Sequence, residues 1–407
     1  MHRGAGYKSR EATNAYEHAR TAALRFAGRV DRDDDVAIIC RNTTEAINHL
    51  AYRLRLERDD VVATTVVEHH ANLLPWARLC ERRFVECTPD GTFTTDDVIT
   101  ALTTTPRPKL LAITGASNVT GWLPPLATII PAAHDAGVPV LVDAAQLAPH
   151  RALPSDADYL AWSAHKMYAP FGSGVLIGPR DAFVEGDPFL AGGGAVDLVD
   201  LDEVTWTDPP EREEAGSPNV IGAVALDAAI TALETIGFGA IAAHDRMLAT
   251  QLRSRLASIP GVRMLGPDLH EDTLPLATFN VGDIHHALVA ARLSAEYGIG
   301  VRHGCFCAHP YLMRLLDLSP EEVAEYRDAV LHGDRHAMPG AVRASAGLST
   351  STDDVDRLIA AVTDIAGGLP APVTYVQDAH TGDYWPEGGP SGWSNDDRAM
   401  GASCAPG

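Results

Sequence analysis

The sequence predicts an α/β fold, in which a large domain built on a mostly parallel sheet is followed by a smaller α+β domain. Three observations lead to this prediction. Residues 36–230 alternate between strand-like and helix-like patterns, which is typical of α/β units. Residues 138–142 form a continuous apolar run, as parallel strands do when both of their faces are buried. Residues 222–259 are mostly helical in pattern and lead into a second region near residue 262.

The elements can be justified in chain order from their hydrophobic patterns. The predicted strands are residues 36–40, 61–67, 110–114, 138–142, 157–162 and 276–281. The predicted helices are residues 43–54, which begin with two threonines, 128–136, 222–259, 284–297 and 353–365. We therefore expect a large domain over 1–245 and a small C-terminal domain over 246–369.

Residues 370–407 are expected to form a flexible C-terminal extension. They are rich in Gly, Pro, Ser and Asp, with isolated aromatic residues, and this composition does not favour a packed core. The extension contains Cys404, which we interpret as an incidental cysteine; sulfur transport and metal binding are the alternatives.

Composition excludes several classes of protein. The formal net charge is −22, which argues against nucleic acid as a partner, because phosphate binding needs a basic face. No segment has the apolar length of a membrane span, and the N-terminus lacks the apolar core of a signal peptide. We expect a cytoplasmic protein without a membrane partner, a resident metal or a disulfide framework, since the six cysteines have no secretory context.

Lys166 and Asp143 are the first candidate site residues. Lys166 is one of only three lysines and lies between an apolar strand and a Gly-containing turn, a place where burial can prepare an amine for imine formation. Asp143 ends the strand before it, at the edge where open α/β sheets bind ligands. Pyridoxal 5′-phosphate (PLP) needs such a lysine and an acid partner for its pyridine nitrogen. Alternatively, Lys166 is a surface lysine and Asp143 a helix N-cap; their pairing favours a PLP site.

Eight short motifs, in order over nearly the whole chain, resemble class V, fold-type I PLP-dependent enzymes, and most closely the cysteine desulfurase and selenocysteine lyase branch. They are residues 41–48 (RNTTEAIN), 68–72 (EHHAN), 117–121 (SNVTG), 142–146 (VDAAQ), 163–166 (SAHK), 214–219 (EAGSPN), 304–310 (GCFCAHP) and 342–345 (VRAS). The resemblance implies the fold of that class, with PLP as cofactor. Members of the family usually have a further N-terminal stretch, and by this resemblance we expect that stretch to be missing from the sequence.

The motifs supply most of the expected cofactor site. A phosphate is well held by a helix N-terminus and hydroxyl donors, which Thr43 and Thr44 provide, with Ser163 and His165 as further donors. The resemblance implies four more contacts: one with the pyridine ring, two on the side of its phenolic oxygen, and one with the phosphate across a subunit interface. The residues implied for these contacts are, respectively, His69, Gln146 and Asn118, and Ser217.

The remaining motifs suggest the reaction. Arg343 suits bidentate capture of an α-carboxylate, although it is alternatively a surface arginine. By resemblance, Cys307 is the catalytic cysteine, Lys166 the general base, and Asn118 also contacts the substrate. The expected activity is PLP-dependent conversion of L-cysteine to L-alanine with a persulfide on Cys307. The second thiol, Cys305, is interpreted as a permissive substitution, with sulfur exchange or a redox pair as alternatives.

Two questions of function stay open at this stage. A class V aminotransferase, epimerase or C–S lyase would use the same site without Cys307, and the preference between sulfur and selenium is undecided. A PLP-fold scaffold without activity is less consistent with the presence of both Lys166 and Asp143. The expected assembly is a homodimer, and a sulfur-acceptor protein is a possible partner.

Overall fold

The computed structural model describes residues 4–32 and 34–388, and their contacts divide the chain into two compact units. Unit 1 comprises residues 1–86, 93–117 and 123–243. Unit 2 comprises residues 244–407 together with two short segments, 87–92 and 118–122. The main break thus lies two residues before the boundary expected from the sequence, and the two short segments could not be assigned from composition.

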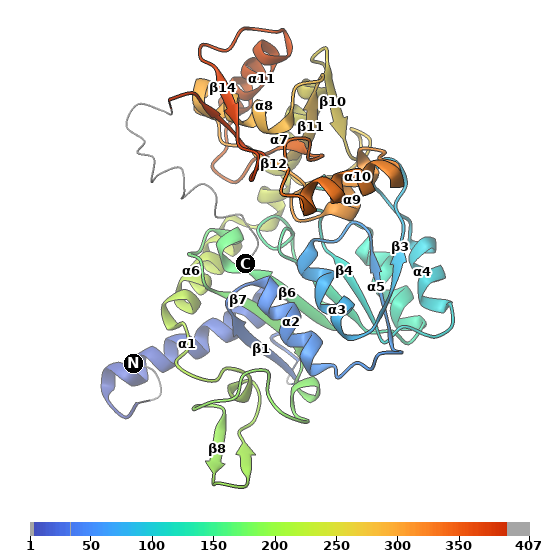
Figure 1. Ribbon diagram of the computed structural model, residues 1–407. Coiled ribbons are helices and arrows are strands. Elements are labelled where there is room, and N and C mark those ends of the chain that lie inside the picture. The colour runs from blue at the N-terminus through green and yellow to red at the C-terminus, as the bar shows by residue number, and fades with distance from the viewer. Residues whose placement is uncertain (1–3, 33, 389–407) are drawn as a thin grey trace. The chain divides into compact units, whose positions relative to one another are not determined.

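Unit 1 is built on a seven-stranded sheet (Figure 1). Its strands are, in spatial order, β1 (Asp35–Cys40), β7 (Gly174–Pro179), β6 (Tyr159–Ser163), β5 (Val140–Asp143), β4 (Leu110–Thr114), β2 (Val61–Thr65) and β3 (Glu81–Val85). The five strands from β6 to β3 are mutually parallel, and β7 runs antiparallel to both β6 and β1. Every residue of β2, β4, β5 and β6 is buried, so the predicted large, mostly parallel sheet is confirmed.

Helices accompany the strands of unit 1. They are α1 (Tyr7–Phe26), α2 (Thr43–Arg53), α3 (Leu74–Leu79), α4 (Thr95–Thr103), α5 (Leu126–Asp135) and α6 (Val220–Ile236), with short 3₁₀ turns η1 (His70–Asn72), η2 (Ala164–Met167), η3 (Arg180–Phe183) and η4 (Glu211–Glu213). A two-stranded ribbon, β8 (Val196–Val199) and β9 (Val204–Trp206), pairs separately from the main sheet. Helix α2 lies against β6 and β7, and α1 packs along α6.

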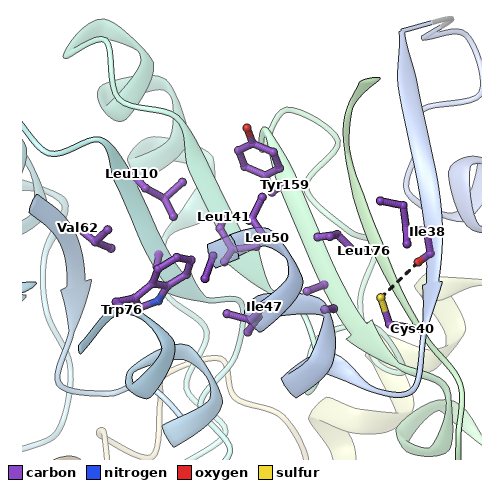
Figure 2. Close-up of a cluster of buried hydrophobic side chains, with 14 of the residues drawn as sticks. Ile38, Cys40, Ile47, Leu50, Val62, Trp76, Leu110, Leu141, Tyr159 and Leu176 are labelled. Atoms are coloured by element: carbon purple, nitrogen blue, oxygen red, sulfur yellow. Dashed lines mark hydrogen bonds between the residues drawn. The ribbon is translucent and has the colours of Figure 1, made fainter. Parts of the chain in front are cut away.

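The core of unit 1 fills the space between α2 and the sheet. Figure 2 shows Ile47 and Leu50 of α2 among Leu141 and Leu176 of the strands, and all four side chains are fully buried. Trp76 of α3 is fully buried in the same cluster. Because this core packs against the strands themselves, the strand ends that carry polar residues are held in fixed positions.

Helix α1 is tied to the rest of unit 1 by a buried carboxylate, Glu214. This residue accepts hydrogen bonds from Tyr16 Oη (2.5 Å) and Arg20 Nη2 (2.7 Å) of α1, and from the backbone N–H of Ile39 in β1 (2.7 Å). Glu214 immediately precedes the loop that contains Ser217, so α1, β1 and this loop share one anchor.

Unit 2 contains a four-stranded antiparallel sheet with helices. Its strands are, in spatial order, β10 (Val262–Leu265), β11 (Leu276–Val281), β13 (Ala341–Ser345) and β12 (Arg302–Gly304). Its helices are α8 (His286–Tyr297), α9 (His309–Leu315), α10 (Pro320–Leu331) and α11 (Thr352–Ala366), and α7 (Phe238–Ala257) crosses the break between the units. A separate core joins α7, α8, α11 and the sheet.

The segment after residue 369 differs from the sequence expectation in its described part. Residues 375–377 (β14, Tyr375–Gln377) and 384–386 (β15, Tyr384–Pro386) pair as an antiparallel hairpin. Tyr375 Oη donates to Glu296 in α8 (3.0 Å), and Gln377 Nε2 donates to the carbonyl of His336 (2.9 Å). These hydrogen bonds to residues distant in sequence stabilise the hairpin, although its own composition does not favour a packed core. Cys404 lies outside the described residues.

Within the described ranges, no single helix is long and apolar enough to cross a membrane. Helices α6 and α7 pass that test only together, and the chain bends by 80° at the break between them. In the same residues, no group of three or more His, Cys, Asp or Glu side chains is arranged to hold a metal ion.

Candidate active site

Unit 1 brings Asp143 and Lys166 together at the carboxyl end of the parallel sheet. Asp143 is the last residue of β5 and pairs with Ala161 of the neighbouring strand β6, and Lys166 lies in η2 directly after β6. Burial raises the pKa of the Asp143 carboxyl, whereas the positive charge of Lys166 and a hydrogen bond from the N–H of Ala145 (2.9 Å) lower it. The two groups therefore interact electrostatically, as a lysine and an acid partner of one ligand would.

Glu68 is a second buried carboxyl in this region, and sequence reasoning gave it no role. Its side chain accepts hydrogen bonds from Thr65 Oγ1 (2.8 Å), Asn72 Nδ2 (2.7 Å) and the backbone N–H of Thr114 (2.9 Å). Burial raises its pKa to about 8, and the charge of Asp143 contributes in the same direction. Glu68 thus joins the ends of β2 and β4 to the η1 turn. The only sequence signal was its place at the start of the motif 68–72.

This anchoring positions His69, the next residue. The backbone N–H of Ala71 donates to His69 Nδ1 (3.0 Å), so Nδ1 acts as an acceptor and the ring proton of the neutral form resides on Nε2. His69 and His70 are both half-buried, with ring centroids 6.3 Å apart. The local fold therefore fixes one tautomer of His69 at the end of β2.

The start of α2 lies against the end of β6. Ser163 Oγ accepts from the backbone N–H of Thr43 (2.8 Å) and is 2.6 Å from Thr43 Oγ1. Asn42, not a threonine, caps the helix by accepting from the N–H of Glu45, and Thr44 is exposed. The hydroxyls of Thr43 and Ser163 consequently meet beside a helix N-terminus, which is a favourable environment for a phosphate.

Other predicted residues of unit 1 lie on neighbouring segments. His165 stacks on Phe171 with ring centroids 5.0 Å apart, and burial, followed by the charge of Lys166, lowers its pKa. Gln146 is half-buried in the turn after β5, and Ser217 is exposed in the loop before α6. The structure thus places His165 beside Lys166, whereas Ser217 is presented outward on its own chain.

Unit 2 contains a tight turn, which we call the cysteine turn, formed by residues 305–308. The backbone N–H of Ala308 donates to the carbonyl of Cys305 (2.9 Å), and both central residues have positive φ, 53° for Phe306 and 55° for Cys307. For residues other than glycine this conformation costs about 1 kcal/mol or more each. Such strain persists only where surrounding contacts enforce it.

Asn118 and Arg343 supply those contacts. Asn118 Nδ2 donates to the carbonyl of Phe306 (2.7 Å), Arg343 Nη1 donates to the carbonyl of Asn118 (2.5 Å), and the Arg343 guanidinium carbon lies 5.1 Å from the centre of the Phe306 ring. The three residues form a closed network around the turn. Neither the role of Phe306 nor the contact between Asn118 and Arg343 was apparent in the sequence, because the three are far apart along the chain.

Arg343 also retains capacity to bind an anion. No carboxylate among the described residues pairs with it, and its enclosed Nε has no hydrogen-bond partner there. Burial, followed by the charge of Arg302, lowers the pKa of the guanidinium to about 10, and Cys307 opposes both. A largely desolvated cation without a counter-charge favours an incoming carboxylate.

The two thiols of the cysteine turn differ. Cys307 is exposed, whereas Cys305 is buried and its S–H donates to the carbonyl of Pro339 (3.1 Å). Burial, followed by the charge of Cys307, raises the pKa of Cys305 to about 12. Because the thiolate is the reactive form, Cys307 is the better placed nucleophile.

One protein family and several individual proteins are similar to this chain over most of its length. The sequence profile of the family described as Aminotransferase class-V matches residues 1–358. A cysteine desulfurase of Dickeya dadantii (strain 3937) is 35% identical over 372 residues, which cover 88% of this chain and 83% of the relative. A probable cysteine desulfurase of Halobacterium salinarum (strain ATCC 700922 / JCM 11081 / NRC-1) is 34% identical over 378 residues, or 89% and 84%.

Solved structures give the same result. The apo structure of a cysteine desulfurase from Thermococcus onnurineus NA1 has a TM-score of 0.78 and 31% identity, covering 90% of this chain and 87% of that one. The Escherichia coli cysteine desulfurase in an S-sulfonic acid form has a TM-score of 0.76 and 33% identity, covering 91% and 88%.

Proposed function

Because this chain belongs to the class-V aminotransferase family, we propose that it is a PLP-dependent cysteine desulfurase, which converts L-cysteine to L-alanine and retains the sulfur as a persulfide on Cys307. The observation that carries the proposal beyond the family is the strained cysteine turn. It presents one exposed thiol whose charge acts on Arg343, a guanidinium that pairs with no carboxylate among the described residues. An aminotransferase or epimerase needs the carboxylate site but has no use for the thiol.

The residues expected to hold the cofactor, which apart from Asn118 lie in unit 1, fit it. Asp143 is a buried acid that faces the charge of Lys166, and the hydroxyls of Thr43 and Ser163 meet at the start of α2. In this proposal Lys166 anchors the cofactor covalently and Asp143 bonds its pyridine nitrogen. The phosphate is held at α2 by Thr43 and Thr44, with Ser163 and His165; His69, Gln146 and Asn118 contact the ring. When bound, PLP stabilises negative charge at the substrate Cα.

The protein groups then divide the reaction between them. Arg343 binds the substrate carboxylate, with Asn118 beside it. Lys166 Nζ removes the Cα proton and returns a proton to Cα when alanine forms. The Cys307 thiolate attacks the substrate Sγ, so that the C–S bond breaks as a new S–S bond forms. The electron pair of the broken bond stays with the substrate, whose Cβ takes up a proton to become the methyl group of alanine. The balance is one cysteine and one thiol giving one alanine and one persulfide, without an external oxidant.

The proposal extends to the assembly and the setting. We place the enzyme in the cytoplasm as a homodimer, in which Ser217 reaches the phosphate of the partner's site and a sulfur acceptor takes the persulfide sulfur. The outward position of Ser217 in its own chain and the prevalence of isologous dimers support this arrangement.

The test is a Cys307→Ala variant assayed with PLP, L-cysteine and a reductant, with alanine and sulfide measured together. We expect wild type to form both in equal amounts, and the variant to bind PLP normally while alanine formation falls to the level without enzyme. Cys305→Ala is the matched control and should retain most activity. A Cys307→Ala variant that converts L-cysteine at the wild-type rate would favour the C–S lyase or aminotransferase alternative.

A further inference from the structure

A pocket of ≈ 470 Å³ lies within unit 2, and both Cys305 and Cys307 line it. This volume lies in the range typical of small-molecule sites. Residues 380–383, the loop of the β14–β15 hairpin, form part of its wall. The hairpin therefore limits the space from which a reactant can approach the cysteine turn.

Hydrogen bonds hold this wall in place. The backbone N–H of Arg335 donates to the carbonyl of Ala379 (2.9 Å). The side chain of Arg335 donates through Nη1 to the carbonyl of His380 (2.9 Å). His303, in the strand that precedes the cysteine turn, lies 3.2 Å from Asp383 of the loop. The hairpin loop that bounds the pocket is thus bonded both to Arg335 and to the strand before the cysteine turn.

The polar lining of the pocket is biased toward cations and hydrogen-bond donors. Among the described residues that line it, Asp383 is the only carboxylate, and it is paired with His303. The other ionisable side chains besides the two cysteines are Arg302, Arg335, His285, His286, His303, His309 and His380. Burial lowers the pKa of His285, His286 and His309, so these three rings favour the neutral form. The guanidinium groups of Arg302 and Arg335 carry permanent positive charge.

This bias is opposite to that of the whole chain, whose net charge is −22. A concave site of one sign concentrates ligands of the opposite sign. The preferred ligand is therefore an anion small enough for the pocket and able to react beside Cys307.

We propose that this pocket receives the sulfur acceptor, and that the acceptor is a small thiol carrying carboxylate groups. The inference rests on the proposed function and specifies its acceptor. The acceptor thiolate attacks the outer sulfur of the Cys307 persulfide. The persulfide S–S bond breaks, a new S–S bond forms in the acceptor, and Cys307 leaves as a thiolate, so no oxidant or reductant is consumed.

Sulfur discharge tests the proposal directly. Holoenzyme is loaded with L-cysteine, and the excess cysteine is removed. The loaded enzyme is then treated with mercaptosuccinate, 2-mercaptoethanol or cysteamine, while mass spectrometry follows the loss of the persulfide. The rate with each thiol is divided by the concentration of its thiolate form. Mercaptosuccinate should be fastest. Arg335→Gln should lower its rate about fivefold, as expected for one partly exposed ion pair, with the rate of neutral 2-mercaptoethanol unchanged.

Two further variants separate charge from hairpin structure. Arg335→Lys keeps the charge and should keep the preference for mercaptosuccinate, and Arg327→Gln removes an exposed charge of α10 outside the pocket and should change nothing. Equal rates for the three thiols in wild type, or a preference that survives in Arg335→Gln, would overturn the proposal.

Alkylation of Cys307 in the unloaded holoenzyme makes the test independent of desulfurase activity. The rate of Cys307 alkylation by iodoacetate is divided by the rate with iodoacetamide, and the ratio is compared with that of free N-acetylcysteine. The ratio should exceed that of the free thiol in wild type and in Arg335→Lys. In Arg335→Gln it should fall toward the value of the free thiol. If no persulfide ever forms on Cys307, the proposed function fails, and the alkylation ratio still decides whether the pocket selects anions.

Discussion

Phe306 offers the sharpest test of how the cysteine turn is built. Its ring stacks on Arg343 at 5.1 Å, and a cation–π contact of a largely desolvated guanidinium contributes about 1–2 kcal/mol. If the stack orients Arg343 for the substrate carboxylate, Phe306→Ala should lower kcat/KM for L-cysteine by a factor of about 5–30. Most of this loss should appear in KM, measured as steady-state alanine formation at saturating PLP.

A second variant, Phe306→Gly, distinguishes the effect of losing the ring from the effect of backbone strain. Phe306→Gly loses the stack as well, but glycine adopts the positive φ of 53° without the cost that alanine carries, about 1 kcal/mol. Its Tm should therefore lie at or above that of Phe306→Ala, while both have the same raised KM.

The matched control is Phe84→Ala, because Arg82 also lies 5.1 Å from the centre of the Phe84 ring, on the exposed edge strand β3. That change should leave KM unaltered. An unchanged KM in both Phe306 variants would refute the positioning role of the ring.

Two further predictions concern the buried carboxyls of unit 1. The pKa of Glu68 is about 8 in the folded protein against an ordinary value of 4.5, so between these pH values the unfolded chain releases a proton that the folded chain keeps. The free energy of unfolding should therefore fall as pH rises from about 4.5 to about 8, and denaturant titrations should show a smaller fall in Glu68→Gln; an identical pH dependence would contradict a buried, protonated Glu68. Asp143→Asn should weaken PLP binding roughly 10- to 100-fold through loss of a charge-assisted bond, measured by equilibrium dialysis, and borohydride should still fix pyridoxyl to Lys166; unaltered affinity would remove Asp143 from the cofactor site.

Two strands that are buried along nearly their whole length were predicted best. Strands 110–114 and 276–281 were located to the residue as β4 and β11, because most side chains in them are apolar and buried. Edge strand β3 was missed, since its sequence ERRFV is largely exposed and carries no periodic signal. The β14–β15 hairpin was missed for a different reason: bonds to residues distant in sequence stabilise it.

The candidate site likewise contains features that the sequence predicted and features that it did not. The proximity of Asp143 and Lys166 followed from the order of two buried strands and a Gly-containing turn. The role of Glu68 did not follow, because it depends on donors from β2, β4 and η1 that only the folded chain assembles. The closed network of Asn118, Phe306 and Arg343 was equally inaccessible, although each of the three lies in a recognised motif.

The anchor at Glu214 has a consequence for the proposed dimer. Glu214 holds α1 through Tyr16 and Arg20, and three residues later the chain reaches Ser217, the proposed contact to the partner's cofactor. Proteolytic loss of α1 would leave a buried carboxylate without its cationic partner, a costly state for a folded chain, and would loosen the loop beside it. Loss of α1 from one subunit of the proposed dimer would thus weaken cofactor binding in the other subunit.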